Sequence, residues 1–93
     1  MEWEWLREVI HRLLSDFPAG RLEIPLRHGC AQVIHPNLTI PVSRPIWTVA
    51  AGEAEKVLTW LRQERLGPFD VILLEFKLGR ITRRGISRWD KLD

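Results

Sequence analysis

The chain contains no tyrosine, and Cys30 is the single cysteine among its 93 residues. One thiol can form neither an internal disulfide nor a cysteine-based zinc cluster. The longest aliphatic run, residues 71–74, is far shorter than the roughly 20 residues that a membrane helix needs. The first residues include Glu2 and Glu4 and no basic region, so we expect no signal peptide. These absences predict a soluble, cytoplasmic protein that does not enter a membrane.

Several motifs that carry chemistry are also missing. The sequence has no G-x-G-x-x-G fingerprint, no Walker loop and no G-x-S-x-G elbow, so nothing favours a cofactor or acyl transfer. Three histidines, His11, His28 and His35, have no carboxylate at metal-ligand spacing, which favours surface positions. Cys30 lies near His28 but lacks a third orienting group, so we expect a small, half-buried strand residue. We therefore predict no catalytic residue, cofactor or metal.

The composition is that of an ordinary globular chain. Apolar residues make up 45% of it and charged residues 28%, which is wrong for a disordered segment. Residues 1–93 are enough for one domain and too few for two. A domain of this size buries only a modest share of its surface, so we expect a homodimer or a protein partner.

Apolar spacing predicts a helix and then a hairpin in the first half. The apolar residues before Pro18 recur at steps of three and four, as on one helix stripe. Residues 22–27 alternate between apolar and polar, which predicts a strand with one buried face. Pro25 cannot donate a ladder hydrogen bond, so we expect this strand to lie at an edge or to carry a bulge. Gly29 suits a tight turn, and residues 30–35 would form the returning strand.

The second half repeats the pattern. Residues 38–43 are either a short third strand or an extended connection. A second helix is expected from about residue 52 to 65, followed by a strand over residues 71–78, a turn at Leu78-Gly79-Arg80 and a return over 81–86. In the strand, we expect Ile72, Leu74, Phe76 and Leu78 to face the core.

The two halves align as an internal repeat of residues 3–35 and 52–86. Leu22, Ile24, Leu26 and Gly29 match Ile72, Leu74, Phe76 and Gly79 at a constant offset of fifty residues. Any two helix–hairpin units would share much of this periodicity, so the halves are either duplicated or only alike in architecture. The predicted fold is α+β: two αββ units forming a four- to five-stranded antiparallel sheet, with both helices on one face.

One stretch of sequence resembles a known family. Leu66-Gly67, Val71-Ile72-Leu73 and Gly79-Arg80-Ile81 are spaced as in the small bacterial YezD-like proteins. The resemblance covers about 35 residues of each half and departs from the family at Pro25 and in residues 36–50. It implies a helix–strand–strand fold and no particular activity, since those proteins have no assigned role.

Glu75-Phe76-Lys77 has the E-x-K form of the metal-dependent PD-(D/E)XK nucleases. Such a site needs a second carboxylate to hold a divalent metal, while the lysine supports the attacking water. Asp70 and Glu23 are the acids available on the predicted strands. The simpler interpretation is that Glu75 and Lys77 face solvent on an amphipathic strand.

Positive charge gathers at the C-terminal end. Residues 77–93 carry six basic residues and two acids, a net charge of +4, whereas the remainder carries eight basic residues and ten acids, a net charge of −2. Arginines can bind phosphates, and an aromatic side chain can stack on an exposed base. Charged residues also protect an edge strand from unwanted pairing. The candidate contacts for nucleic acid are Lys77, Arg80, Arg83, Arg84, Arg88 and Trp89.

Five tryptophans are the other oddity of the composition. Trp5 and Trp60 fall off the apolar stripes of their helices, which favours an interface or the rim of a small core. The leading hypothesis is a non-catalytic binding or interaction module that contacts nucleic acid through its basic C-terminal hairpin. The alternatives are a nuclease-like site at Glu75 and Lys77, or a structural subunit of a protein complex.

Overall fold

The computed structural model describes residues 3–31, 34–40 and 46–87. Its helices are α1 (Glu4–Asp16) and α2 (Glu53–Gln63). Its strands are β1 (Ala19–Arg27), β2 (Cys30–Ala31), β3 (His35–Leu38), β4 (Val71–Lys77) and β5 (Arg80–Ser87). All strand pairs are antiparallel, which confirms the predicted α+β class. Neither described helix is long and apolar enough to cross a membrane.

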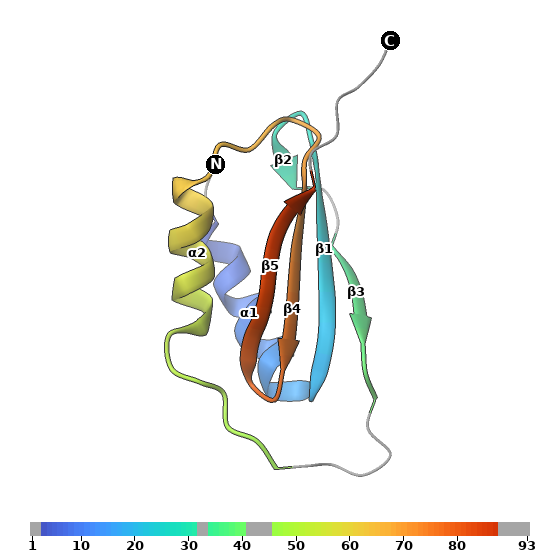
Figure 1. Cartoon of the computed structure of the whole chain (residues 1–93), viewed down its shortest axis with the longest axis vertical. Helices are drawn as coiled ribbons and strands as arrows, with labels where there is room; N and C mark the ends of the chain where they lie inside the picture. Colours follow the sequence, from blue (N-terminus) through green and yellow to red (C-terminus); the bar gives the residue numbers. More distant parts are fainter. Residues whose placement is uncertain (1–2, 32–33, 41–45, 88–93) are drawn as a thin grey trace.

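The sheet has β1 and β4 at its centre and β5 at one end. Both β2 and β3 pair with the same side of β1, and β4 pairs with its other side. Within the described residues no strand lies beyond β5, so its outward edge is not covered by sheet. Figure 1 shows α2 alongside β5 and α1 behind β5 and β4.

One hydrophobic cluster joins the helices to the sheet. Every second residue of β1 and β4 is buried in it, as the period-two pattern predicts. Both helices and Trp3 contribute to the same cluster. Its strand members are Leu22, Ile24, Leu26, Ile72, Leu74 and Phe76. We call the sheet face that carries these buried residues the inner face. The residues between them point to the opposite side, which we call the outer face; they include Arg21, Glu23, Leu73 and Glu75.

Leu78 was expected in the core, but the structure places it in the β4–β5 turn. Its side chain is 43% exposed and its φ is 47°. Leu78 and Gly79 both have positive φ, which is the geometry of a type I′ hairpin turn. The turn thus includes Leu78, as predicted, and the expectation that Leu78 also faces the core is wrong.

Pro25 does not place its strand at an edge, so of the two predicted alternatives, an edge strand or a bulge, the first is wrong. The Leu26 N–H donates to the Asp70 carbonyl at 2.9 Å. Leu26 and every second residue from it along β1 therefore direct their backbone N–H and C=O groups toward β4. Pro25 therefore faces the opposite side, where β2 pairs with residues 26–27 and β3 with residues 20–23. Because Pro25 falls between those two short pairings, its missing N–H costs no bond to either described strand.

The returning strand of the first hairpin, predicted over residues 30–35, is described only in part, because residues 32–33 lie outside the described residues. β2 covers Cys30–Ala31, and the third strand lies at His35–Leu38 rather than at residues 38–43. Of that predicted third strand, residues 41–43 lie outside the described residues. Cys30 is exposed rather than half-buried.

The two hairpins share local geometry. His28 and Gly29 have φ values of 55° and 79°, close to the 47° and 81° of Leu78 and Gly79. The β1–β4 register is also symmetric between the two halves. Leu22 pairs with Leu74, and the residues equivalent to these two, Ile72 and Ile24, pair with each other. This is the pairing expected of two units related by a two-fold axis. Duplication as its origin stays a prediction.

Candidate functional site

Consecutive arginines of β5 lie on opposite faces of the sheet. Arg84 pairs in register with the buried Leu74, and its guanidinium carbon lies 5.1 Å from the ring centre of Trp60 in α2. Arg83 pairs in register with Glu75 on the outer face. The alternation follows from strand geometry, because successive side chains point to opposite sides. The predicted basic cluster is therefore divided by the strand that carries it.

A groove of about 370 Å³ separates α2 from β5. Its charged and polar lining comes from both elements: Glu53 and Lys56 of α2, and Arg80, Thr82, Arg83 and Arg84 of β5. Val57 and Ile81 supply apolar contacts. We call this the edge groove. It brings a helix lysine to the arginines of the hairpin.

Glu53 holds the two sides of the edge groove together. Its Oε2 accepts the outward-pointing N–H of Ile81 at 2.8 Å, and its Oε1 lies 3.5 Å from the Lys56 ammonium. The residue is buried, so this carboxylate stands where a neighbouring strand would otherwise supply an acceptor. Thr82 is the extra residue of a bulge at this point, since Glu75 pairs with Arg83 and Phe76 with Ile81.

The outer side of the same edge carries a second group of charges. Arg21, Glu75 and Arg83 share one rung across β1, β4 and β5. The Arg83 guanidinium lies 3.8 Å from the Glu75 carboxylate, and its side chain is 80% exposed. These three residues line a depression of about 240 Å³ over Leu73 and Gly85, and Arg84 also borders it. Nothing lies within 4 Å of a Cβ built on Gly85, so this depression is open.

The structure brings together only some of the residues predicted to contact nucleic acid. Arg80, Arg83 and Arg84 line the edge groove, Lys77 is exposed at the end of β4, and Arg88 and Trp89 lie outside the described residues. Sequence reasoning missed Lys56 and Arg21. Both are distant in sequence, and no local pattern marks them, since each is one polar residue among others on an amphipathic element.

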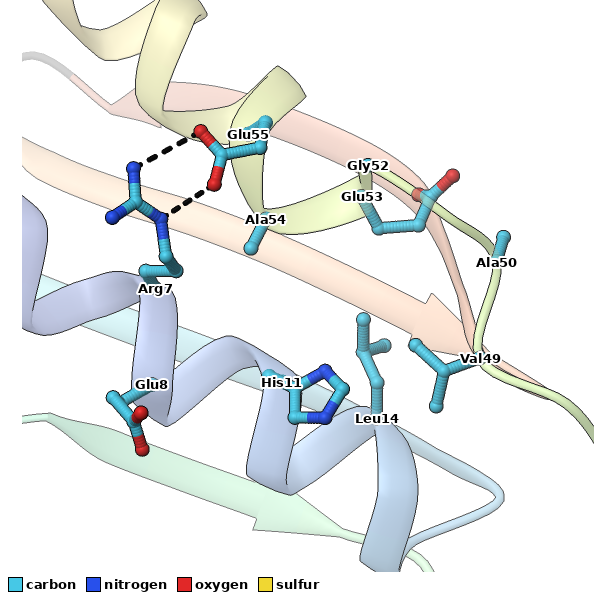
Figure 2. Close-up of a pocket in the computed structure, with 10 residues that line it drawn as sticks. All are labelled: Arg7, Glu8, His11, Leu14, Val49, Ala50, Gly52, Glu53, Ala54 and Glu55. Atoms are coloured by element: carbon cyan, nitrogen blue, oxygen red, sulfur yellow. Dashed lines mark hydrogen bonds and ion pairs between the residues drawn. The ribbon is translucent and has the colours of Figure 1, made fainter.

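A further pocket of about 260 Å³ lies between α1 and the start of α2. Figure 2 shows Arg7 of α1 reaching across to Glu55, with the Arg7 Nη2 donating to Glu55 Oε2 at 3.0 Å. This hydrogen bond, more than any other neighbour, raises the pKa of Arg7 above its ordinary value. A second ion pair, between Arg62 and Glu4, also links the helices. These charges hold the helices together rather than face a ligand.

Of the two acids that could complete the possible nuclease motif, Asp70 is distant from Glu75 along β4, whereas Glu23 shares the outer face with Glu75. Glu75 faces Arg83 on the outer face, whereas Asp70 is buried at the other end of β4, where its Oδ2 accepts the Gly67 N–H at 2.7 Å. Glu23 lies on the outer face opposite Leu73. Within residues 3–31, 34–40 and 46–87, no three His, Cys, Asp or Glu side chains lie close enough to share a metal ion.

Two of the tryptophans of interest have different surroundings. Trp60 is half-buried, and its indole N–H donates to Glu64 at 3.0 Å. Trp5 is 40% exposed and lies 6.4 Å from the buried Trp3, measured between ring centres. Trp60 is therefore explained by packing under Arg84 and at the helix surface. Trp5 remains an exposed aromatic residue.

The fold and the site define a small α+β domain with an uncovered basic edge strand. Comparison of the chain with protein-family models, with curated proteins and with solved structures finds no match. The resemblance to YezD-like proteins therefore stays a prediction, and the interpretation of the site depends on its chemistry alone.

Proposed function

We propose that the chain is a non-catalytic, cytoplasmic binding module that contacts nucleic acid through the basic edge of its sheet. The observation that supports this is the edge groove, where Lys56 of α2 joins Arg80 and Arg84 of β5. Arg83 lines the groove as well, and these four cations are accompanied there by one carboxylate, Glu53, which accepts the Ile81 N–H.

The arginines of the edge are available to a phosphate. Among the described residues, Arg80 and Arg84 have no carboxylate within 4.0 Å. The ring of Trp60 orients the Arg84 guanidinium, and such contacts are worth roughly 0.5–1 kcal/mol at exposed sites. An arginine held in place loses less side-chain entropy when it binds a phosphate oxygen. Lys56 and Arg83 are paired with Glu53 and Glu75, but both cations are exposed. Such exposed ion pairs are weak, so they hold these cations only loosely.

The test is an electrophoretic mobility titration with mixed-sequence DNA at low and moderate salt. The wild-type chain should bind, and its affinity should fall steeply as salt rises, because phosphate contacts release counterions. A double variant, Arg80→Ala with Arg84→Ala, should lose most of this binding. The matched control is Arg12→Ala with Arg27→Ala, which removes the same charge from exposed positions outside the groove. Absence of any shift at low salt would reject the proposal.

Glu75→Gln separates this proposal from the nuclease alternative. In a binding module Glu75 repels phosphate and partly neutralises Arg83, so its removal should strengthen binding. The expected gain is about two- to fivefold, since an exposed ion pair is worth up to about 1 kcal/mol. A metal-dependent nuclease would instead lose cleavage of DNA in the presence of Mg²⁺. The two outcomes are read from the same variant by a binding titration and a cleavage gel.

A homodimer or a role as a structural subunit remains a prediction. Trp5 is the exposed aromatic that could lie in such an interface. Light scattering of the purified chain gives its mass in solution. A homodimer at this residue predicts a dimeric mass for the wild-type chain and a lower mass for Trp5→Ala. A monomeric mass for both would contradict it.

A further inference from the structure

The cations of the basic edge form two groups, one on each side of β5. On the inner side, Lys56 and Arg84 line the edge groove beside α2. On the outer side, Arg83 pairs in register with Glu75 and lines the depression over Gly85 together with Arg21. Arg83 and Arg84 each border the other hollow as well, so it is the register of β5 that assigns them to opposite sides. In the inner group, Arg84 contacts the ring of Trp60. In the outer group, Arg21 and Arg83 stand on one rung with Glu75 between them, and their side chains make exposed ion pairs with Glu23 and Glu75.

Among the described residues, no strand pairs with the outward edge of β5. β5 ends the strand order of the described sheet. Its bulge at Thr82 and the Glu53 carboxylate at the Ile81 amide both oppose the addition of another strand there. The edge is therefore better suited to a ligand that meets side chains on both of its sides than to a peptide that extends the sheet.

The number of phosphate backbones distinguishes the ligands that such an edge could take. A single strand has one backbone, which would follow one side of β5 and leave the cations of the other side without phosphates. A duplex presents two backbones on either side of a groove, and the major groove, about 12 Å wide, admits a β-ribbon. Resting on the proposed function, we infer that this edge binds duplex DNA, with the inner cations on one backbone and the outer cations on the other.

The inference is tested with two double variants and a matched control. Lys56→Ala with Arg84→Ala removes the inner group, Arg21→Ala with Arg83→Ala removes the outer group, and Arg12→Ala with Arg27→Ala removes two exposed charges elsewhere. Affinity is measured against salt for a mixed-sequence duplex and for its separated strands. Circular dichroism and urea unfolding check that each variant is folded, and Arg84→Lys, which keeps the charge, serves as a second inner variant.

We expect the duplex to bind more tightly than either strand. Each group makes two phosphate contacts, so its removal should lower the salt dependence, d log K/d log[salt], by about 1.8 in magnitude. The control should leave this slope unchanged, and Arg84→Lys should largely retain it. Equal or tighter binding of the single strand, or a slope unaffected by one of the two double variants, would overturn the inference while the binding function stands. Absence of binding to either ligand would instead refute the proposed function itself.

Discussion

Gly29 and Gly79 occupy equivalent positions of the two hairpins, and replacing each with alanine separates two costs. Both have positive φ, 79° and 81°, and an L-residue in this region costs about 1–2 kcal/mol. Nothing lies within 4 Å of a Cβ on Gly29, whereas a Cβ on Gly79 would lie 2.4 Å from the Thr48 carbonyl oxygen. The Gly79 carbonyl also accepts the Ala50 N–H at 2.9 Å.

The expected loss of unfolding free energy is therefore larger for Gly79→Ala. Gly29→Ala should lose about 1–2 kcal/mol, which is the conformational cost alone. Gly79→Ala should lose about 3–5 kcal/mol, because the segment at Thr48 must also move. The hydrogen bond from the Ala50 N–H to the Gly79 carbonyl, worth about 1 kcal/mol, is then strained or lost. Urea unfolding followed by tryptophan fluorescence measures both losses, and an unchanged m-value would show that the unfolded state is comparable. Equal losses for the two variants would refute the steric argument.

Three further substitutions test the packing. Gly20→Ala should cost about 1–3 kcal/mol by urea unfolding, because its Cβ would lie 2.7 Å from the Phe76 ring; a neutral result would contradict the contact. Glu53→Ala should cost about 1–3 kcal/mol because it leaves the Ile81 N–H without an acceptor, and Glu53→Gln should recover part of this; identical losses would argue against the hydrogen bond. Leu78→Asn should raise the thermal midpoint, since Asn-Gly favours a type I′ turn and Leu78 is exposed; a lower midpoint would contradict this reasoning.

The elements of the fold could be predicted because their signals are local. The helix stripes and the alternation of residues 22–26 and 72–76 predict which side chains are buried. The structure buries the apolar residues of both strands, and it buries or partly buries those of the helix stripes. Pro25 misled because its effect depends on which side of β1 its missing N–H faces, and that is set by the register with β4. Periodicity does not contain this long-range information.

The sequence predicts which basic residues belong to the candidate site, but it does not predict how they are arranged in space. That Arg83 and Arg84 point to opposite faces follows from strand alternation alone. The partners that give each of them its surroundings, Glu75 and Trp60, depend on the pairing of β4 with β5 and on the position of α2. Arg21 comes to the same rung only because β1 and β4 are neighbours in the sheet.

The self-consistent β1–β4 register has a consequence for assembly. Its pairings run through a central pair, Glu23 with Leu73, whose members are themselves fifty residues apart, the offset of the two hairpins. A polypeptide of half this length with the same pattern could therefore build the central strands from two identical molecules. Joining the halves in one chain frees each to change alone, so arginines could accumulate on the last strand without a matching set on the first hairpin.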